Sequence, residues 1–336
     1  MGSIALRSPY YRKDTAVTGA NSAKLTLTID GTLQYTLVKS TTAGDTMLWE
    51  ISELCRDFLQ LSYDGISANE TITIISTLTS HASTDGTGTA LSTDTDTDIG
   101  YESYGIFMQG ANPITYPPSS IPTWLVAPDP NHTGINDEYF IYAPTGETGR
   151  VPYINTSYQL GYSTFTANQT EISGTSAGKR MNIVRVDCTK YGQGHKVAFV
   201  NKYGAVQELW LFLKSVNSIT KKQEQYQRNI LRTSGNIAGT YSQSTHTKQD
   251  YNTIANENIT LSSGYYPEWT NQWFEQLLLS EQIWIHRTKE TNPSQTDVIP
   301  VNIKTSNFTK KTVLNNKLIE YTFDFDMSFD YINNVR

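Results

Sequence analysis

The segment KLIEYTFDFDMSFD at residues 317–330 alternates large apolar residues with acidic residues along its whole length. Successive side chains of a β-strand point to opposite faces, so this pattern predicts a strand with one apolar face and one carboxylate face. A register slip of one residue would bury four carboxylates, each costing several kcal/mol against a total stability of about 5 to 15 kcal/mol. A strand of this length spans roughly 40 Å, so we expect it to extend past its own sheet and pair with a neighbouring subunit.

Alternation recurs along the chain and predicts a mainly β fold. KLTLTIDGTLQYTLVK (24–39) predicts a β-hairpin that turns at Asp30-Gly31. HKVAFVNKYGAVQELWLFLKS (195–215) predicts a second hairpin, which turns between Asn201 and Gly204. We predict further strands at 70–77, 123–128, 138–144, 150–155, 258–262, 281–287 and 298–304.

Two stretches change to helical spacing, at 50–61 and 265–280, and each predicts a short helix leaning on a sheet. The 336 residues are enough for two domains. We therefore predict two β-sandwich-like domains, each with one short packed helix. The predicted division is an N-terminal arm at 1–20, a domain at 21–180 with a low-complexity loop at 80–100, and a domain at 181–336 with its helix at 266–280.

Composition excludes several classes of protein. The net charge is −6, which argues against nucleic acid as a partner because phosphate binding needs a basic surface. No apolar run approaches the roughly 18 residues of a membrane span, so no membrane association is expected. Cys55 and Cys188 are the two cysteines, and we expect two unpaired, buried thiols rather than one disulfide bridge.

The sequence shows no convincing catalytic or metal-binding motif. The histidines His81, His132, His195, His246 and His286 have no metal-ligand spacing, and we interpret them as solvent-exposed loop residues or satisfied structural residues. The alternating Asp94, Asp96 and Asp98 resemble the start of a calcium loop, but Ile99 and Gly105 stand where that loop needs Gly and Glu. We therefore predict no cofactor, no metal and no enzymatic activity.

The second hairpin places His195, Asn201 and Glu208 close together, which raises the question of a catalytic site. We interpret Asn201 as a turn residue, His195 as the start of a strand, and Glu208 as an outward-facing side chain beside Gln207. On this interpretation the hairpin serves packing alone.

Several segments carry a family resemblance: RVDCTKYGQGHKVAFVNKYGAVQELWLFLKS, RSPYYR with KLTLTIDG, WEISELCRDFL and GYESYGIFMQGANP. They resemble segments of virion structural proteins of marine and environmental tailed bacteriophages. The resemblance implies a tail, baseplate or neck protein of the virion, assembled in the bacterial host cytoplasm, with no catalytic residues to carry over. It also implies partners, namely further copies of the chain in a ring and other tail or neck proteins.

The leading functional hypothesis is therefore a structural subunit that self-associates and docks neighbouring virion proteins. We expect the interfaces in the N-terminal arm and the last strand, at Tyr10, Tyr11, Arg12, Tyr321, Phe325 and Phe329. An alternative is a carbohydrate-binding module for host-surface glycans, in which Tyr101 and Tyr104 stack on sugar rings. A third hypothesis is a glycoside hydrolase that uses the acids of the last strand.

Overall fold

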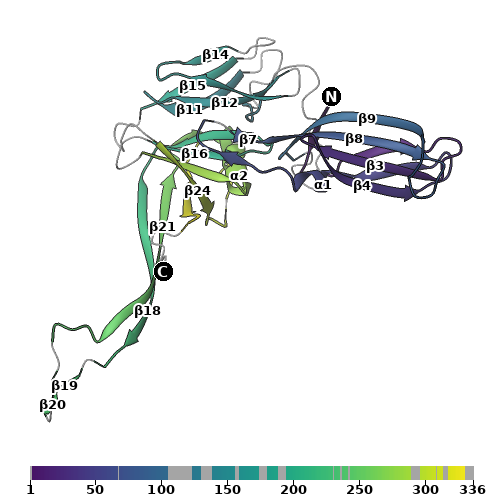
Figure 1. The fold of residues 1–336 in the computed structure, drawn as a ribbon. Helices are drawn as coiled ribbons and strands as arrows, with labels where there is room; N and C mark the ends of the chain where they lie inside the picture. The colour runs from purple at the N-terminus through teal and green to yellow at the C-terminus, as the bar shows by residue number, and fades with distance from the viewer. Residues whose placement is uncertain are drawn as a thin grey trace.

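The computed structural model describes residues 2–66, 68–104, 123–129, 138–155, 159–173, 180–187, 194–229, 231–234, 237–240, 243–288, 296–307, 309–312 and 317–329. The fold is mainly β with short helices, as predicted. Figure 1 shows an N-terminal sheet unit that projects to one side, two smaller sheets in the middle of the chain, and a large C-terminal sheet. A two-stranded ribbon extends from the large sheet away from the rest of the molecule.

The N-terminal unit contains a five-stranded sheet in the order β1-β9-β8-β3-β4. Its strands are β1 (Gly2–Ala5), β3 (Ser22–Ile29), β4 (Thr32–Ser40), β8 (Thr71–His81) and β9 (Ala90–Tyr101). The inner face of the sheet packs against the small sheet of β2 (Tyr11–Thr15) and β5 (Thr46–Glu50) and against α1 (Ser52–Arg56). A short pair, β6 (Ser62–Tyr63) and β7 (Ala68–Asn69), follows. The predicted hairpin is confirmed, and its turn residues Asp30 and Gly31 have φ angles of 47° and 81°.

The predicted N-terminal arm is wrong, because residues 2–5 and 11–15 are strands of this unit. Strand β1 pairs in parallel with β9, and Ile4 and Leu6 are buried in the core. Only these two apolar residues alternate there, too few for a strand pattern to stand out from the sequence.

The predicted loop at 80–100 is also wrong, because β8 continues to His81 and β9 begins at Ala90. His81 is buried rather than exposed to solvent. The threonines of β9 provide the β propensity that a count of apolar residues overlooks, and the hydroxyls of Thr77 and Thr95 lie 3.1 Å apart across the two strands. The apolar cover for this hairpin comes from the neighbouring strands.

Two small sheets form the middle of the chain. One is β10 (Thr123–Trp124), β12 (Gly149–Ile154) and β13 (Leu160–Phe165), and the other is β11 (Glu138–Pro144), β15 (Arg180–Val186) and β14 (Glu171–Ser173). Because β15 pairs with β11 over seven residues, a domain boundary at residue 181 would divide a sheet. The strands of the middle segment therefore belong together.

The C-terminal sheet has seven strands in the order β17-β16-β23-β24-β26-β21-β18. They are β16 (His195–Val200), β17 (Val206–Leu211), β18 (Ser215–Gln227), β21 (Lys248–Ser262), β23 (Ile283–Thr288), β24 (Thr296–Ile303) and β26 (Thr322–Met327). The helix predicted at 266–280 is a 3-10 turn, η2 (Glu268–Thr270), followed by α2 (Asn271–Leu279). The pair β22 (Tyr266–Pro267) and β25 (Leu318–Ile319) flanks it, and β19 (Arg232–Ser234) pairs with β20 (Ile237–Thr240) at the ribbon tip.

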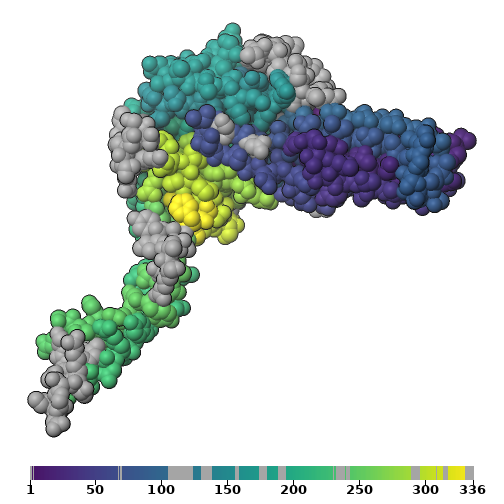
Figure 2. All heavy atoms as spheres, viewed as in Figure 1, coloured from purple at the N-terminus to yellow at the C-terminus, as the bar shows by residue number. Residues whose placement is uncertain are grey.

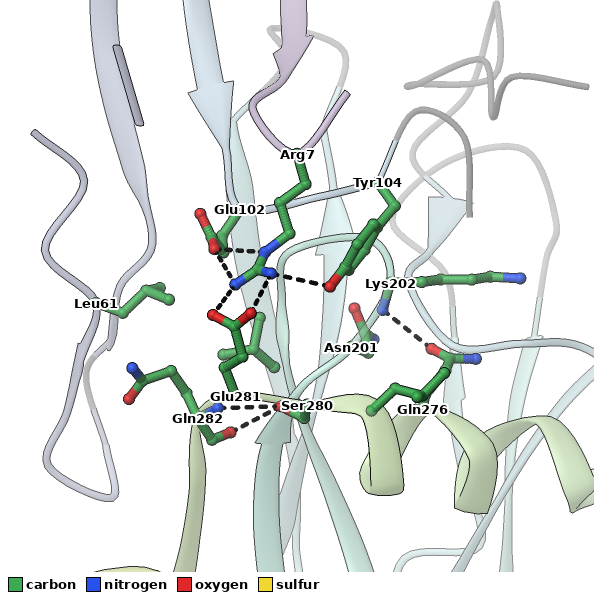
Figure 3. A pocket seen from close by; sticks show the side chains of 12 residues that line it. Arg7, Leu61, Glu102, Tyr104, Asn201, Lys202, Gln276, Ser280, Glu281 and Gln282 are labelled. Atoms are coloured by element: carbon green, nitrogen blue, oxygen red, sulfur yellow. Dashed lines mark hydrogen bonds and ion pairs between the residues drawn. The ribbon is translucent and has the colours of Figure 1, made fainter. Parts of the chain in front are cut away.

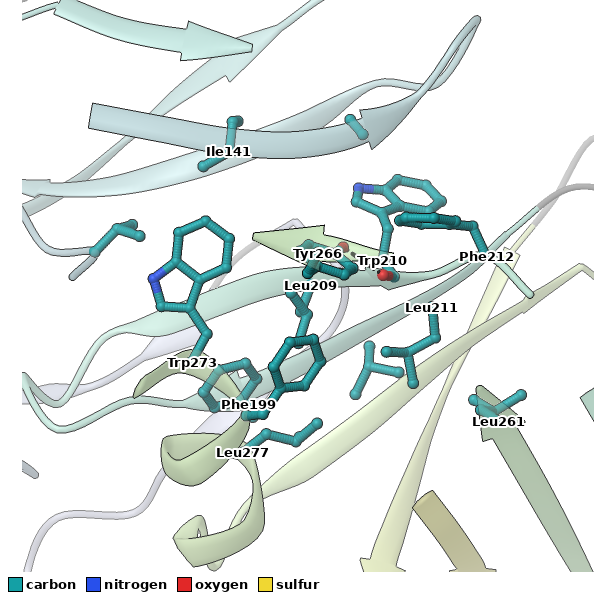
Figure 4. Close-up of a cluster of buried hydrophobic side chains, with 14 of the residues drawn as sticks. Ile141, Phe199, Leu209, Trp210, Leu211, Phe212, Leu261, Tyr266, Trp273 and Leu277 are labelled. Atoms are coloured by element: carbon teal, nitrogen blue, oxygen red, sulfur yellow. Dashed lines mark hydrogen bonds between the residues drawn. The ribbon is translucent and has the colours of Figure 1, made fainter. Parts of the chain in front are cut away.

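One large core joins the middle sheets to the C-terminal sheet (Figure 4). Trp273 of α2 lies at its centre and donates its indole N–H to the carbonyl of Ala127, 3.1 Å away. The Tyr266 hydroxyl donates to the carbonyl of Trp210, 2.6 Å away. Buried aromatic residues such as these usually place a polar edge on a partner, so the packing here is specific as well as apolar.

The long final strand is not continuous, which corrects the expected 40 Å strand and its overhang. The chain pairs with β22 over Leu318–Ile319 and with β21 over Thr322–Met327, and it bends between them. Strand β21 turns into β22 at Gly264 (φ 85°), and the last strand follows the same corner. The predicted apolar face is nevertheless confirmed as far as Met327, while Phe329 is 53% exposed.

Candidate functional site

The six predicted interface residues do not come together in the structure. Tyr11 is exposed, whereas Tyr10 is half-buried against the N-terminal core. Arg12 is buried and forms ion pairs with Asp94 and Asp96 of β9. These contacts fix β2 against β9 within one chain, so Arg12 has an internal role.

The predicted interface residues of the last strand also differ in burial. Tyr321 and Phe325 are buried in the large core and offer no surface to a partner, which corrects their assignment as interface residues. Phe329 is exposed. The carboxylate of Asp324 accepts a bond from the Thr260 hydroxyl at 2.5 Å, and Asp326 lies 3.2 Å from the Lys304 ammonium. These acids lie on the face of a sheet among small polar groups, which is unlike the facing pair of a glycosidase.

The two tyrosines proposed to stack on sugar rings make contacts within the chain instead. Tyr101 is fully buried in the structure. The Tyr104 ring lies under the Arg7 guanidinium, with the guanidinium carbon 5.1 Å from the ring centroid. This pair of residues therefore presents no open stacking surface.

The most unusual surface of the molecule is the ribbon, which we define as residues 219–254 and call the β-ribbon. Sequence reasoning predicted no element between 216 and 257, yet β18 and β21 are the longest strands described. They pair with each other as far as Gln227 and Lys248, whereas β26 accompanies β21 only from Asn258 onward. The β-ribbon is thus two strands wide, and Figure 2 shows it as a thin limb beyond the body.

The β-ribbon exposes apolar and aromatic side chains. Every residue of β18 is exposed to solvent. Lys222 pairs with Ile254, and Tyr226 lies four residues further along β18, so these three side chains share one face. The Tyr226 ring contacts the Tyr251 ring at a centroid distance of 6.0 Å, and both rings remain more than two-fifths exposed. This face carries Tyr226, Tyr251 and Ile254 beside Lys222, and the rest of the described chain does not cover it.

The β-ribbon also carries basic charge. Residues 219–254 include five Lys and Arg against two Asp and Glu, a net charge of +3 in a chain of net charge −6. Its cross-strand polar contacts include Lys221 with Asp250 at 3.1 Å and the Tyr226 hydroxyl with the Gln249 amide oxygen at 2.6 Å. Such exposed pairs contribute little stability, typically below about 1 kcal/mol each.

Arg7 forms a charged junction between the N-terminal unit and the C-terminal sheet (Figure 3). Its guanidinium donates to Glu102 at 2.5 Å, to the Tyr104 hydroxyl at 2.9 Å, and to both oxygens of Glu281 at 2.7 and 2.5 Å. The bonds from Arg7 lower the pKa of Glu281. One adjoining pocket holds only about 20 Å³, the space of a single water molecule. A second hollow, of about 480 Å³, is bordered by Arg7, Glu50 and Tyr104.

A second junction buries Glu70, which precedes β8, against the middle sheets and β17. Its carboxylate accepts bonds from the Tyr162 hydroxyl and from the Val206 backbone N–H, the latter at 3.1 Å. Burial raises the pKa of Glu70 to about 7, although the bonds from Tyr162 and Val206 and the charge of Arg150 all act to lower it. The Arg150 guanidinium lies between two tyrosine rings, with its carbon 4.2 Å from the Tyr162 centroid.

Glu208 belongs to the same junction and is buried, which corrects its expected outward orientation. It lies 3.3 Å from the Arg150 guanidinium and 3.5 Å from the Lys196 ammonium. The Tyr63 hydroxyl lies 2.8 Å from the Nε2 atom of His286. Burial, helped by the charges of Lys196 and Arg150, lowers the pKa of His286 to about 3.

A surface hollow of about 370 Å³ lies beside this junction, and Lys196 and His286 are among its lining residues. A general base works best when its pKa lies near the operating pH, so the imidazole of His286 is a weak one. Among the described residues, no group of three or more His, Cys, Asp or Glu side chains could hold a metal ion. The hollow therefore lacks the recognisable parts of a hydrolytic or metal site.

Comparisons with known proteins provide no family for the chain: no family model, no curated protein and no solved structure matches it. None of the helices in the described part of the chain is long and apolar enough to cross a membrane. Cys188, His132 and Asp330 lie outside the described residues. Cys55 is a free, buried thiol, and burial raises its pKa to about 12.

Proposed function

We propose that this protein is a structural subunit that assembles with copies of itself and with neighbouring proteins of a larger particle. The resemblance of its segments to virion proteins of tailed bacteriophages suggests that the particle is a phage tail, baseplate or neck. The observation that carries the proposal is the β-ribbon, an extension of the large sheet with exposed apolar side chains and no cover from the described chain.

The physical argument concerns the stability of two-stranded β structure. A two-stranded hairpin on its own is at best marginally stable in water, because it buries too little apolar surface to offset the entropy of ordering its backbone. Nine residues of β18, from Ile219 to Gln227, extend about 30 Å with only β21 beside them. A partner surface that covers Tyr226, Tyr251 and Ile254 supplies the missing burial.

The charged junctions support the same proposal, because they are suited to holding a rigid shape. Arg7 joins the first strand region to Glu281, and Glu70 joins the N-terminal unit to β13 and β17. Rigid units presenting one extended limb are well suited to building repeating assemblies, since little conformational freedom is lost when the partners bind.

The test compares the wild-type chain with a shortened one. Replacing residues 224–252 by Asn-Gly joins Gln223 to its pairing partner Thr253 through a favourable hairpin turn. We expect light scattering to show oligomers of the wild type and monomers of the shortened chain. A cooperative thermal unfolding transition in both proteins shows that each is folded. A wild-type chain that stays monomeric at every attainable concentration contradicts the proposed function.

A further inference from the structure

We propose that the surface hollow bordered by Lys196 and His286 binds a small hydroxylated carboxylate, a molecule with the size and chemistry of a sugar acid. The volume of the hollow, about 370 Å³, is within the range of small-molecule sites. The inference concerns a ligand site on the single chain, so it does not depend on the assembly proposed above.

The hollow lies where the N-terminal unit, the middle sheets and the C-terminal sheet meet. The β6–β7 turn contributes residues 64–66 to its lining, the β11–β12 turn contributes residues 147–148, and strands β16, β17, β23 and β24 contribute most of the rest. Gly65 has a φ angle of 96°, and a Cβ atom there would lie 2.7 Å from Cγ2 of Val298. Glycine therefore allows the β6–β7 turn to approach the C-terminal sheet closely and to close one border of the hollow.

The junction beside the hollow contains more buried positive charge than its hydrogen bonds satisfy. The side chains of Arg150 and Lys196 are only 6% and 16% exposed. Both cations share one carboxylate oxygen, Oε1 of Glu208, at 3.3 and 3.5 Å. Within the described part of the chain, the Nε and Nη2 atoms of Arg150 have no aligned hydrogen-bond acceptor. Buried cations are normally paired and hydrogen-bonded, so this junction can accept a further anion.

Glu70 offsets this charge only in part. The bonds that its carboxylate accepts come from the Tyr162 hydroxyl and the Val206 backbone N–H. Burial raises the pKa of Glu70 to about 7, so near neutral pH a fraction of the carboxyl groups is protonated and uncharged. The hollow is electropositive at His286, where burial and then the charges of Lys196 and Arg150 lower the pKa of the imidazole to about 3.

Lys196 is the cation that a ligand can reach, because it belongs to the lining of the hollow. Its ammonium group has three donors, and its bond to Glu208 is 3.5 Å long, at the outer limit of a hydrogen bond. A ligand carboxylate on Lys196 would leave Glu208 to pair more closely with Arg150. One anion would thereby satisfy both buried cations.

The rest of the lining favours hydroxyl groups on the same ligand. Thr148, Thr288 and Thr296 line the hollow and are exposed to solvent, and the carboxylates of Asp64 and Glu147 border it too. These acids would repel a doubly charged anion such as phosphate, whereas they accept hydrogen bonds from hydroxyls. The arrangement therefore selects a molecule with one carboxylate and several hydroxyl groups.

Ligand-observed NMR titration with three small probes tests the ligand class. We expect glucuronate to bind with a dissociation constant on the order of 1 mM. Glucose lacks the carboxylate and acetate lacks the hydroxyls, so each should bind at least tenfold more weakly. Equal affinities for glucuronate and acetate would overturn the sugar-acid assignment, and no detectable glucuronate binding at about 50 mM would overturn the site.

Variants locate the binding to the hollow. Lys196→Met should weaken glucuronate binding at least tenfold, because it removes a charged hydrogen bond to the ligand. Lys221→Met changes an exposed lysine of the β-ribbon and is the matched control, with unchanged affinity expected. A cooperative thermal transition shows whether each variant is folded. Thr288→Val alters an exposed side chain of the lining and should weaken binding severalfold, which keeps the site testable if Lys196→Met does not fold. Wild-type affinity in folded Lys196→Met, or in Thr288→Val if Lys196→Met is unfolded, would contradict the proposal.

Discussion

Glu70 provides the sharpest test of the buried junction, through the pH dependence of stability. Its ordinary pKa of 4.5 is raised to about 7 by burial. Between these two values the folded chain keeps a proton that the unfolded chain has released, so stability falls as pH rises through this window. A shift of about 2.5 pH units at 1.36 kcal/mol per unit corresponds to a loss of about 3 kcal/mol between pH 4.5 and pH 7.

Glu70→Gln imitates the protonated carboxyl and removes this titration while keeping an acceptor for the Val206 N–H. We expect the variant to gain about 3 kcal/mol relative to the wild type between pH 5 and pH 8. Urea unfolding at half-unit pH steps, followed by tryptophan fluorescence, measures the difference. Because His286 titrates equally in both proteins, it cancels from the comparison.

The control is Glu53→Gln, which removes an exposed carboxyl of α1. Its stability curve is expected to run parallel to that of the wild type. Parallel curves for Glu70→Gln as well would refute the reasoning, because they would show that Tyr162 and Arg150 hold Glu70 fully ionised in the folded chain despite its burial.

Three further predictions concern other buried groups. The imidazole of His286, with a pKa lowered from 6.5 to about 3, supports stability that is complete above pH 6.5 and lost as pH falls toward 3; His286→Gln should flatten that acid limb in unfolding titrations. Trp273→Ala should cost about 3 to 5 kcal/mol in urea unfolding, and a cost below about 1 kcal/mol would contradict its central place in the core. The Cys55 thiol, with its pKa raised to about 12, should react with a thiol reagent only after unfolding, as peptide mass spectrometry of labelled protein can show.

Strand and helix types followed from the sequence wherever apolar residues alternated or recurred at helical spacing. The hairpin at Asp30-Gly31 and the apolar face from Ile319 to Met327 were predictable on this basis. Strand β9 was not, because its β-forming threonines alternate with aspartates, which are uncommon in strands, and its apolar cover comes from other strands. The bend at 320–321 depends on the corner at Gly264, a distant residue that local alternation cannot identify.

The candidate surfaces were harder to predict than the fold. The β-ribbon is polar along most of its length, and a polar strand without a buried face has the same composition as a loop. Glu70, Arg150 and Glu208 are far apart in sequence, and only tertiary packing brings their charges together. Single polar residues in separate strands show no characteristic spacing in the sequence, so this junction becomes visible only in the folded structure.

The shared core of the middle and C-terminal sheets has a consequence for how the chain reaches its native state. Trp124 and Phe323 belong to the same core, although about two hundred residues separate them. Contacts this distant close slowly, since a large loop must be ordered before any burial is gained. The N-terminal sheet is built from the first hundred residues alone, so it can form early during synthesis. The apolar side chains of the middle strands stay uncovered until β26 has been synthesised, and in that interval they are open to aggregation or to chaperone binding.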